Sequence, residues 1–360
     1  MMILTDKTHY STIEKINQEA LWKKGSLFFN DYGGVMQNQG LRFSISYVKS
    51  MRLYYGFVTG IAGWIGVSYY KFCEPDQFHV GRGILILIVL FLSWGVNQIV
   101  NDYMGLAEDR INAPNRPMVT GELNPSLAIG ISFLLTVGML GLSWQLNPWS
   151  IIPVILGVIL NIVYEYAKAW SLVGNGVFGL AISMATAYGF LASGPLPEPL
   201  FTKNRIAAMI LVIILNGLMT YYTYFKDVRG DRRAGKKTFI VRHGLRVARS
   251  TGIAGAFLPT AVYLFFLIAK WMPPSDILFM EHFVFCGVIT IFLQLWTAVL
   301  YFKYPYGERT YFSLVTNIRA CVAGQVAIIA IFNGTLALYL LCGSYVFIGF
   351  LFDLYRDARS

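Results

Sequence analysis

The chain has 360 residues, of which 56% are hydrophobic and only 13% are charged, and its mean hydropathy is +0.55. Soluble domains carry about a quarter of charged residues, so this composition excludes an ordinary soluble domain and indicates an integral, multi-pass membrane protein. The net charge of +10 is concentrated at the membrane face, which argues against nucleic-acid binding and favours contact with membrane lipids.

The first 45 residues differ in composition from the rest of the chain. They are polar and mixed in charge, without the continuous apolar core and small-residue cleavage site of a signal peptide. We therefore predict a cytoplasmic N-terminal extension over residues 1–45 and a membrane domain over residues 46–360.

Apolar runs that could cross a bilayer recur through the membrane domain. Crossing takes about 20 helical residues, and we count nine such runs. The predicted fold is an all-α membrane protein with nine transmembrane helices. The predicted spans are 51–70, 83–103, 124–145, 149–167, 173–193, 206–225, 251–270, 283–302 and 321–342, with an apolar piece at 344–355 interpreted as an extension of the ninth.

Lys and Arg in the loops orient the chain, because cytoplasmic loops are enriched in both. Nine of them lie between residues 226 and 249, whereas the loop at 145–149 has none. The polar N-terminus falls on the same, cytoplasmic side as the basic loop. An odd number of spans then places the C-terminus outside.

Two acid-rich segments end the second and sixth predicted spans. The first contains Asn101, Asp102 and Asp109, and the second contains Asp227 and Asp231. Carboxylates where a helix leaves the bilayer are costly to desolvate and indicate a functional site. Helical positions four or eight apart share a face, so Asn101 aligns with Asp109, and Asp227 aligns with Asp231. Two such faces around a central cavity would form an oxygen-rich cage for hard divalent cations and phosphates.

Three ordered motifs extend this pattern. Residues 101–121 are similar to an Asn-Asp-x-x-Asp-x-x-x-Asp motif with trailing Arg-Pro and Gly, and residues 226–238 are similar to an Asp-x-x-x-Asp segment followed by Gly-x-x-Thr. Between them, residues 164–168 match Tyr-x-x-x-Lys, and Asn175-Gly176 follows. In these motifs the sequence resembles the UbiA superfamily of intramembrane prenyltransferases, over residues 46 to 342.

This resemblance implies an enzyme that binds an isoprenyl diphosphate through two Mg²⁺ ions and ionises the allylic C–O bond. The prenyl group would then pass to a lipophilic acceptor, expected to be aromatic. The alternative is a terpene cyclase of the same superfamily, in which the cation closes on its own chain without an acceptor. A transporter or channel is a third interpretation, but it predicts charges near mid-span, whereas here they lie at the cytoplasmic ends of the spans.

The resemblance also assigns site residues, position by position. The implied metal ligands are Asn101, Asp102, Asp109, Asp227 and Asp231. Lys168 matches the diphosphate-binding lysine of the family, and Tyr164 and Tyr188 match tyrosines near the diphosphate or the reacting carbon. Further positive charge for the substrate is expected from Arg116, Arg229 and Lys236. The four aspartates, Lys168 and Tyr164 are the expected catalytic residues.

The first acidic segment departs from the family pattern at Gly105, where an Asp is usual. Glu108 or a water could supply the missing ligand, the first metal could be bound more loosely, or the site could serve another outcome such as cyclisation. Asn97, one helical turn before Asn101 and on the same face, is a second polar group that could compensate and contact substrate.

Each assignment has a simpler structural alternative. The carboxylates could pair with neighbouring Arg and Lys in a solvated loop, Lys168 could extend to the membrane interface, and the tyrosines could belong to an interfacial belt. Arg52, at the start of the first span, is interpreted as an orientation anchor rather than a phosphate ligand. Glu165 receives no role.

Overall fold

The computed structural model describes residues 39–195, 201–272, 280–307 and 309–355. The chain divides into two units, residues 1–46 and 47–360. The predicted extension over residues 1–45 lies almost wholly outside the described residues, so it stays a prediction.

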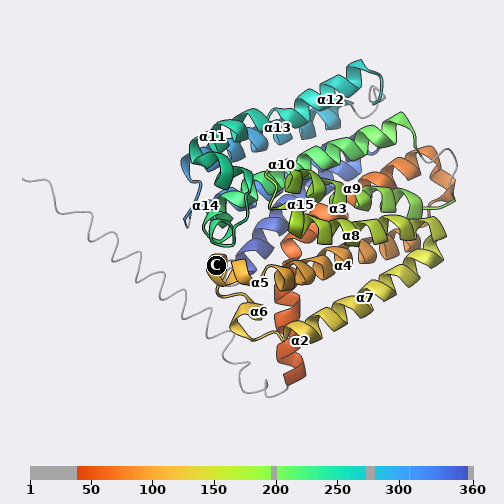
Figure 1. Ribbon diagram of the computed structural model, residues 1–360. Helices are drawn as coiled ribbons and strands as arrows, with labels where there is room; N and C mark the ends of the chain where they lie inside the picture. Colours follow the sequence, from red (N-terminus) through yellow and green to blue (C-terminus); the bar gives the residue numbers. More distant parts are fainter. Residues whose placement is uncertain (1–38, 196–200, 273–279, 308, 356–360) are drawn as a thin grey trace, which may run out of the picture. The chain divides into compact units, whose positions relative to one another are not determined.

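The described residues form helices joined by turns, and no strand occurs among them (Figure 1). The helices are α2 (Gln39–Met51), α3 (Gly56–Cys73), α4 (Val80–Met104), α5 (Leu106–Asn112), α6 (Pro117–Thr120), α7 (Pro125–Leu146), α8 (Ile151–Ala167), α9 (Val173–Ala192), α10 (Lys203–Arg233), α11 (Phe239–Gly255), α12 (Leu258–Ile268), α13 (Met280–Lys303), α14 (Thr310–Ala330) and α15 (Gly334–Leu354).

Nine helical stretches among the described residues are long and apolar enough to cross a membrane. They are α4, α7, α8 with its preceding turn, α9, α10, the joined pair α11 and α12, α13, α14 and α15. The predicted all-α membrane fold is therefore confirmed. The set of spans differs from the prediction at both ends, because α3 is not among these nine whereas α15 is an additional one.

The predicted ninth span, 321–342, is wrong. α14 ends at Ala330 and α15 begins at Gly334, so a turn interrupts the predicted span. Asn333 begins the new helix, because its side chain accepts a hydrogen bond from the Leu336 N–H. Since Ile331 and Phe332 occupy the turn, the run stays apolar and hydropathy alone does not reveal the break.

α15 returns the chain to the end of the bundle where α3 begins. The rings of Phe352 and Tyr355 lie 5.1 and 5.8 Å from the ring of Tyr54, centroid to centroid. Tyr54 follows Arg52, which pairs with Asp102 of the first acidic segment. The last described residues therefore lie at the same end as the acidic segments, not at the opposite end as an odd number of crossings predicted.

α3 lies inside the bundle, against α9, and the two backbones approach closely at glycines. A Cβ atom at Gly66 would lie 2.1 Å from the Thr186 carbonyl oxygen, and one at Gly189 would lie 1.9 Å from the Gly63 carbonyl oxygen. Small residues permit such close helix packing in membranes. The Thr186 hydroxyl also donates to the Ala62 carbonyl across this contact, at 2.8 Å.

The other long helices surround this pair. α9 packs against α3, α8 and α10, α4 packs against α7, and α14 packs against α13, α15 and α3 (Figure 1). The short helix α5, which follows α4, contacts α10. This contact brings the first acidic segment, on α4 and α5, next to the second acidic segment, on α10.

Candidate active site

A polar cavity of about 840 Å³ lies where α4 and α5 meet the end of α10. Its lining combines residues from α4, α5, α8, α9 and α10 with Arg52, Tyr55, Arg116 and Lys236. Ten ionisable acidic and basic side chains are part of that lining. They are the acids Asp102, Glu108, Asp109, Asp227 and Asp231, and the bases Arg52, Arg116, Lys168, Lys226 and Lys236. The structure thus places both acidic segments on one cavity.

Asn112 joins the two acidic segments. Its side-chain amide donates to the Asp227 carbonyl at 3.2 Å, and its side-chain oxygen accepts from the Gly230 N–H at 2.9 Å. A Cβ atom at Gly230 would lie only 2.2 Å from the Asn112 Nδ2 atom. Glycine is therefore required at this point of α10 if the Asn112 amide is to lie against the helix backbone.

Arginines bind the carboxylates of the first segment. Asp102, which is 2% exposed, accepts from Arg52 at 2.5 Å, from Gln98 at 3.0 Å and from Arg116 at 3.4 Å. Arg116 also pairs with Asp109. The Arg52 backbone has the left-handed conformation, with φ 49° and ψ 61°, which is uncommon for a residue other than glycine.

A second set of ion pairs covers the side formed by α8 and the α10–α11 loop. Lys168 pairs with Glu165 at 2.5 Å, and its ammonium lies 4.5 Å from the centre of the Tyr164 ring. Lys236 pairs with Glu108 at 2.7 Å and lies 3.7 Å from Glu165. Glu165 is buried, and burial without a partner would be costly for a carboxylate. These contacts place both lysines at the cavity.

Burial and neighbouring charge shift several pKa values here. Burial raises the pKa of Asp109 and outweighs the opposing charge of Arg116. Burial alone would raise the pKa of Glu108, but its hydrogen bond and ion pair with Lys236 lower it overall. For Lys168, burial would lower the pKa, but the charge and hydrogen bond of Glu165 together with the charges of Tyr224 and Asp231 outweigh it, so this pKa is raised. The Lys168 side chain is therefore a stable cation at neutral pH.

Gly105 separates α4 from α5, so the first acidic segment is not the single helix that the predicted face of Asn101 and Asp109 required. A Cβ atom at Gly105 would lie 3.0 Å from the Asn101 carbonyl oxygen and 3.9 Å from Oε2 of Glu108. The Glu108 carboxylate therefore lies beside the space that a side chain at position 105 would use.

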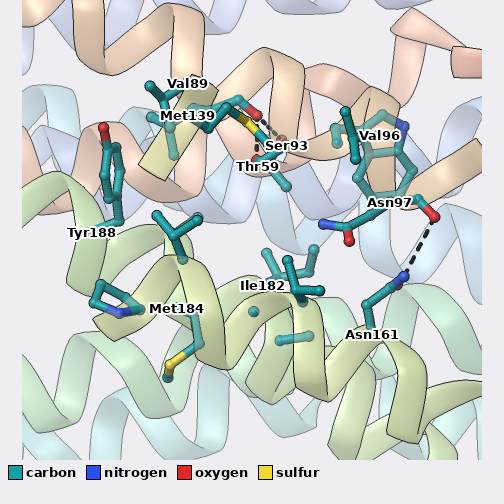
Figure 2. A pocket seen from close by; sticks show the side chains of 18 of the residues that line it. Thr59, Val89, Ser93, Val96, Asn97, Met139, Asn161, Ile182, Met184 and Tyr188 are labelled. Carbon is teal, nitrogen blue, oxygen red and sulfur yellow. Dashed lines mark hydrogen bonds between the residues drawn. The ribbon is translucent and has the colours of Figure 1, made fainter. Parts of the chain in front are cut away.

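An apolar inner chamber of about 770 Å³ adjoins the polar cavity. Trp94, Gln98, Asn101 and Phe178 line both spaces and form their junction. Most of the chamber wall is aliphatic, including Val89, Val96, Met139, Val154 and Ile182. Figure 2 shows its polar groups, with Asn97 and Asn161 on one side and Tyr188 on the other. Asn161 donates to the Asn101 side chain at 2.9 Å.

Most predicted site residues line the polar cavity. They are Asn101, Asp102, Asp109, Arg116, Tyr164, Lys168, Asp227, Asp231 and Lys236. Three predicted substrate contacts do not. Arg229 is exposed and outside the lining, because it projects from α10 away from Asp227 and Asp231. Asn97 and Tyr188 line the inner chamber instead, so Asn97 does not compensate for Gly105 in the polar cavity.

Sequence reasoning missed Arg52 and Asn112. Arg52 was interpreted as an orientation anchor, yet it is buried in an ion pair with a residue 50 positions away. Asn112 lies within the first motif, but its partner Gly230 is 118 positions away. The neighbouring sequence gives no signal for either contact.

No group of three or more His, Cys, Asp or Glu side chains within the described residues is close enough to hold one metal ion by itself. Instead, the carboxylates of Asp102, Glu108, Asp109 and Asp227 each have a cationic partner. The lining nevertheless supplies hard oxygen donors from α4, α5 and α10, which is the donor chemistry that Mg²⁺ prefers.

Comparison with known proteins identifies the family. The sequence model of the UbiA prenyltransferase family matches residues 62–311. The digeranylgeranylglyceryl phosphate synthase of Thermococcus kodakarensis is 24% identical over 59% of this chain and 74% of its own length. The bacteriochlorophyll synthase 33 kDa chain of Rhodobacter capsulatus is 25% identical over 68% of this chain and 80% of its own length.

Solved structures show the same fold. The apo structure of a UbiA homolog from Aeropyrum pernix superimposes with a TM-score of 0.60 at 15% identity, over 78% of this chain and 96% of that one. A UbiA homolog from Archaeoglobus fulgidus bound to GPP and Mg²⁺ gives a TM-score of 0.57 at 16% identity, over 82% and 99%. The match of the family model over more than half of the residues shows that the chain belongs to the UbiA prenyltransferase family.

Proposed function

We propose that this enzyme transfers the prenyl group of an isoprenyl diphosphate to a lipophilic acceptor at the junction of the polar cavity and the inner chamber. The main support is that a cavity lined by charged side chains adjoins an apolar one and shares four lining side chains with it. A diphosphate needs cations around its oxygens, whereas a prenyl chain needs apolar surroundings. The two cavities provide both environments within the reach of one molecule.

Mg²⁺ fits the donor set of the polar cavity. We propose that Asn101, Asp102, Asp109, Asp227 and Asp231 would together hold two ions. Bound Mg²⁺ supplies Lewis-acid neutralisation of the negative charge that develops on the leaving diphosphate. The Archaeoglobus homolog that binds GPP with Mg²⁺ supports Mg²⁺ as the metal.

The basic side chains of the cavity bind the diphosphate itself. Arg116 lines the cavity from just before α6 and Lys168 from just after α8, and Arg52 and Lys236 line it from other connecting segments. When the allylic C–O bond breaks, its electron pair stays on the diphosphate oxygen. Cations already in place stabilise that charge without reorganisation, which is the usual source of large electrostatic effects in catalysis. Lys168 acts as a cation and not as a base, because its pKa is raised.

Aromatic rings surround the junction where the allylic carbon would lie. The Trp94 ring stacks on Tyr55 at 5.2 Å between centroids, and the Phe178 ring lies 6.5 Å from Trp94 and 5.1 Å from Tyr164. The faces of such rings stabilise a nearby positive charge. The carbocation would persist here until a nucleophilic atom of the acceptor bonds to it and the acceptor loses a proton.

The acceptor is proposed only as a class. The names of the relatives refer to digeranylgeranylglyceryl phosphate and to bacteriochlorophyll, and both products are lipophilic. The expectation of an aromatic acceptor stays a prediction. Terpene cyclisation remains the alternative, because the Gly105 departure leaves the first metal site different from the family pattern.

The decisive experiment incubates purified protein with Mg²⁺ and geranyl, farnesyl or geranylgeranyl diphosphate. Parallel reactions contain a glyceryl phosphate lipid, an aromatic acceptor or no acceptor, and mass spectrometry identifies the products. We expect a prenylated acceptor and no cyclic product. Cyclic hydrocarbons or alcohols formed without acceptor would establish the cyclase alternative, and no consumption of any diphosphate would contradict both.

We also propose that the polar cavity opens to the cytoplasm, because the basic segment 226–249 adjoins it. Since α15 returns to this end, the last described residue, Tyr355, belongs on the same side as the cavity. Reporter fusions after residue 360 test this orientation. Activity of a cytoplasmic reporter is expected, and activity of a reporter that works only outside the cytoplasm would contradict the orientation.

A further inference from the structure

An outer cleft of about 840 Å³ adjoins the inner chamber beyond the junction with the polar cavity. Residues of α3, α8, α9 and α10 line it, and the lining is apolar apart from a few side chains such as Arg205. Its α8 residues Ile152 and Leu156 are 48% and 42% exposed. Because α8 is a candidate membrane span, this cleft faces the hydrocarbon of the bilayer.

A thin wall separates the inner chamber from the outer cleft. Two side chains line both spaces, Met184 of α9 and Pro153 of α8. The helices leave little else between the two spaces, since Gly157 of α8 has no side chain and a Cβ atom there would lie 3.9 Å from Cβ of Met184. Figure 2 shows Met184 on the side of the chamber opposite Asn97 and Asn161.

The three spaces therefore follow one another along α9. Phe178 belongs to the junction with the polar cavity, Met184 belongs to the wall, and Phe190 lines the outer cleft. A chain whose diphosphate occupies the polar cavity would pass the junction, cross the chamber and reach Met184 with its far end. Methionine is flexible and unbranched, so it can close a gap or move aside more easily than a β-branched side chain.

We propose that Met184 sets the length of the prenyl chain that this enzyme prefers, and that the outer cleft receives the distal isoprene units of longer chains. This inference rests on the proposed function. Apolar pockets discriminate between substrates that differ by one methylene by about 10- to 200-fold. A prenyl diphosphate whose chain must displace Met184 therefore has a lower kcat/KM, and a smaller side chain at position 184 removes this loss.

Continuity with the inner chamber argues for the substrate chain as the occupant of the outer cleft. An acyl chain of a membrane lipid would also suit its apolar lining, but it would have no reason to respond to the size of Met184. Binding of a prenyl chain in the outer cleft should therefore depend on the size of the side chain at position 184, whereas binding of a lipid acyl chain should not.

The test compares kcat/KM for geranyl, farnesyl and geranylgeranyl diphosphate in the native protein and three variants. Met184→Ala opens the wall, Met184→Trp thickens it, and Met280→Ala is the matched control, because Met280 is exposed on α13 and lines none of the three spaces. We expect Met184→Ala to raise the ratio of the longest to the shortest substrate by about tenfold or more. Met184→Trp should lower that ratio, and Met280→Ala should leave the preferred length unchanged.

Thermal stabilisation by each diphosphate is measured alongside, so that a variant with impaired chemistry still reports its length preference. Equal ratios in the native protein and both Met184 variants would overturn the inference, as would a tenfold shift in Met280→Ala. Displacement of a fluorescent acyl lipid without any change in the ratios would assign the cleft to lipid. If the native protein neither binds nor consumes a prenyl diphosphate, the proposed function itself fails.

Discussion

The polar cavity and the inner chamber share four side chains at their junction, yet different forces shape them. Polar contacts between segments distant in sequence hold the cavity, as in Arg52 with Asp102 and Asn112 with Gly230. The chamber is bounded by aliphatic side chains and by small residues of α8 and α9 such as Gly157, Ala181 and Ala185. We infer that changes in the cavity alter the chemistry, whereas changes in the chamber alter which substrate fits.

The largest effect should follow loss of a carboxylate in the cavity. Asp231→Ala or Asp227→Ala is expected to lower kcat by at least about a hundredfold, because the Mg²⁺ that these carboxylates are proposed to hold would no longer neutralise the negative charge that forms on the diphosphate. Turnover of a prenyl diphosphate measures the effect, and the midpoint of thermal unfolding reports whether the fold is intact. Glu122→Ala is the control, because Glu122 is exposed and outside the cavity lining. Near-native turnover in either Asp variant would contradict the metal assignment.

The contact between the two acidic segments should come next. Gly230→Ala places a methyl group against the Asn112 amide, so it should separate α5 from α10 and lower kcat/KM by about ten- to a hundredfold, as expected for small misplacements of catalytic groups. Overpacking of this kind also destabilises by about 1–3 kcal/mol.

The matched comparison for this pair is Asn112→Ala, alone and combined with Gly230→Ala. The double variant should be no worse than Asn112→Ala alone, because the clash is gone. If the effects of the two single changes simply add, the contact does not position the acidic segments.

An intermediate effect is expected at Glu108. We propose that its carboxylate replaces the Asp that the family has at position 105, because its Oε2 atom lies beside that space. Glu108→Ala should weaken Mg²⁺ binding by about tenfold, a typical cost for losing a group that supports a metal site. Isothermal titration with Mg²⁺ and diphosphate measures the affinity directly.

Rescue distinguishes this role from simple loss of the Lys236 ion pair. Gly105→Asp in the Glu108→Ala background should recover most of the Mg²⁺ affinity, because it returns a carboxylate to the same place. A variant that stays weak despite Asp at position 105 would show that Glu108 acts only through Lys236.

The smallest effect is predicted in the inner chamber. Tyr188→Phe removes a hydroxyl far from the charged lining, so kcat/KM should change by less than about fivefold, equivalent to about 1 kcal/mol. Tyr164→Phe serves for comparison, because Tyr164 lines the polar cavity beside Lys168. A larger loss for Tyr188→Phe than for Tyr164→Phe would contradict the division between cavity and chamber.

Sequence alone was sufficient for the class of fold and for much of the cavity. Apolar runs predict transmembrane helices reliably, because a span must satisfy its backbone internally and present apolar side chains to lipid. Asp227 and Asp231 were recognisable because carboxylates at the end of such a run have few structural reasons to be there. Lys168 was predicted only from the resemblance of the Tyr-x-x-x-Lys pattern to the family motif.

Local sequence patterns were insufficient where the place of a side chain depended on distant partners or on the face of the helix from which it projects. Arg229 lies between Asp227 and Asp231 in sequence, yet it is exposed, because a helix turns its intermediate positions to another face. Tyr188 matched a motif position but lines the inner chamber. The turn between α14 and α15 was hidden because its Ile331 and Phe332 are as apolar as the helices beside it.

Composition, apolar periodicity and the spacing of acidic residues thus determined that this is a helical membrane protein, and they predicted a cation- and phosphate-binding site at one end of it. Only the tertiary structure decided that Arg52 belongs to that end, that Asn112 joins its two acidic segments, that Arg229 does not line its cavity, and that α15 returns the chain to it. The physical reason is that hydropathy and helical spacing act over one or two turns. Ion pairs such as Arg52 with Asp102 and contacts such as Asn112 with Gly230 join residues 50 and 118 positions apart, and only packing brings those together.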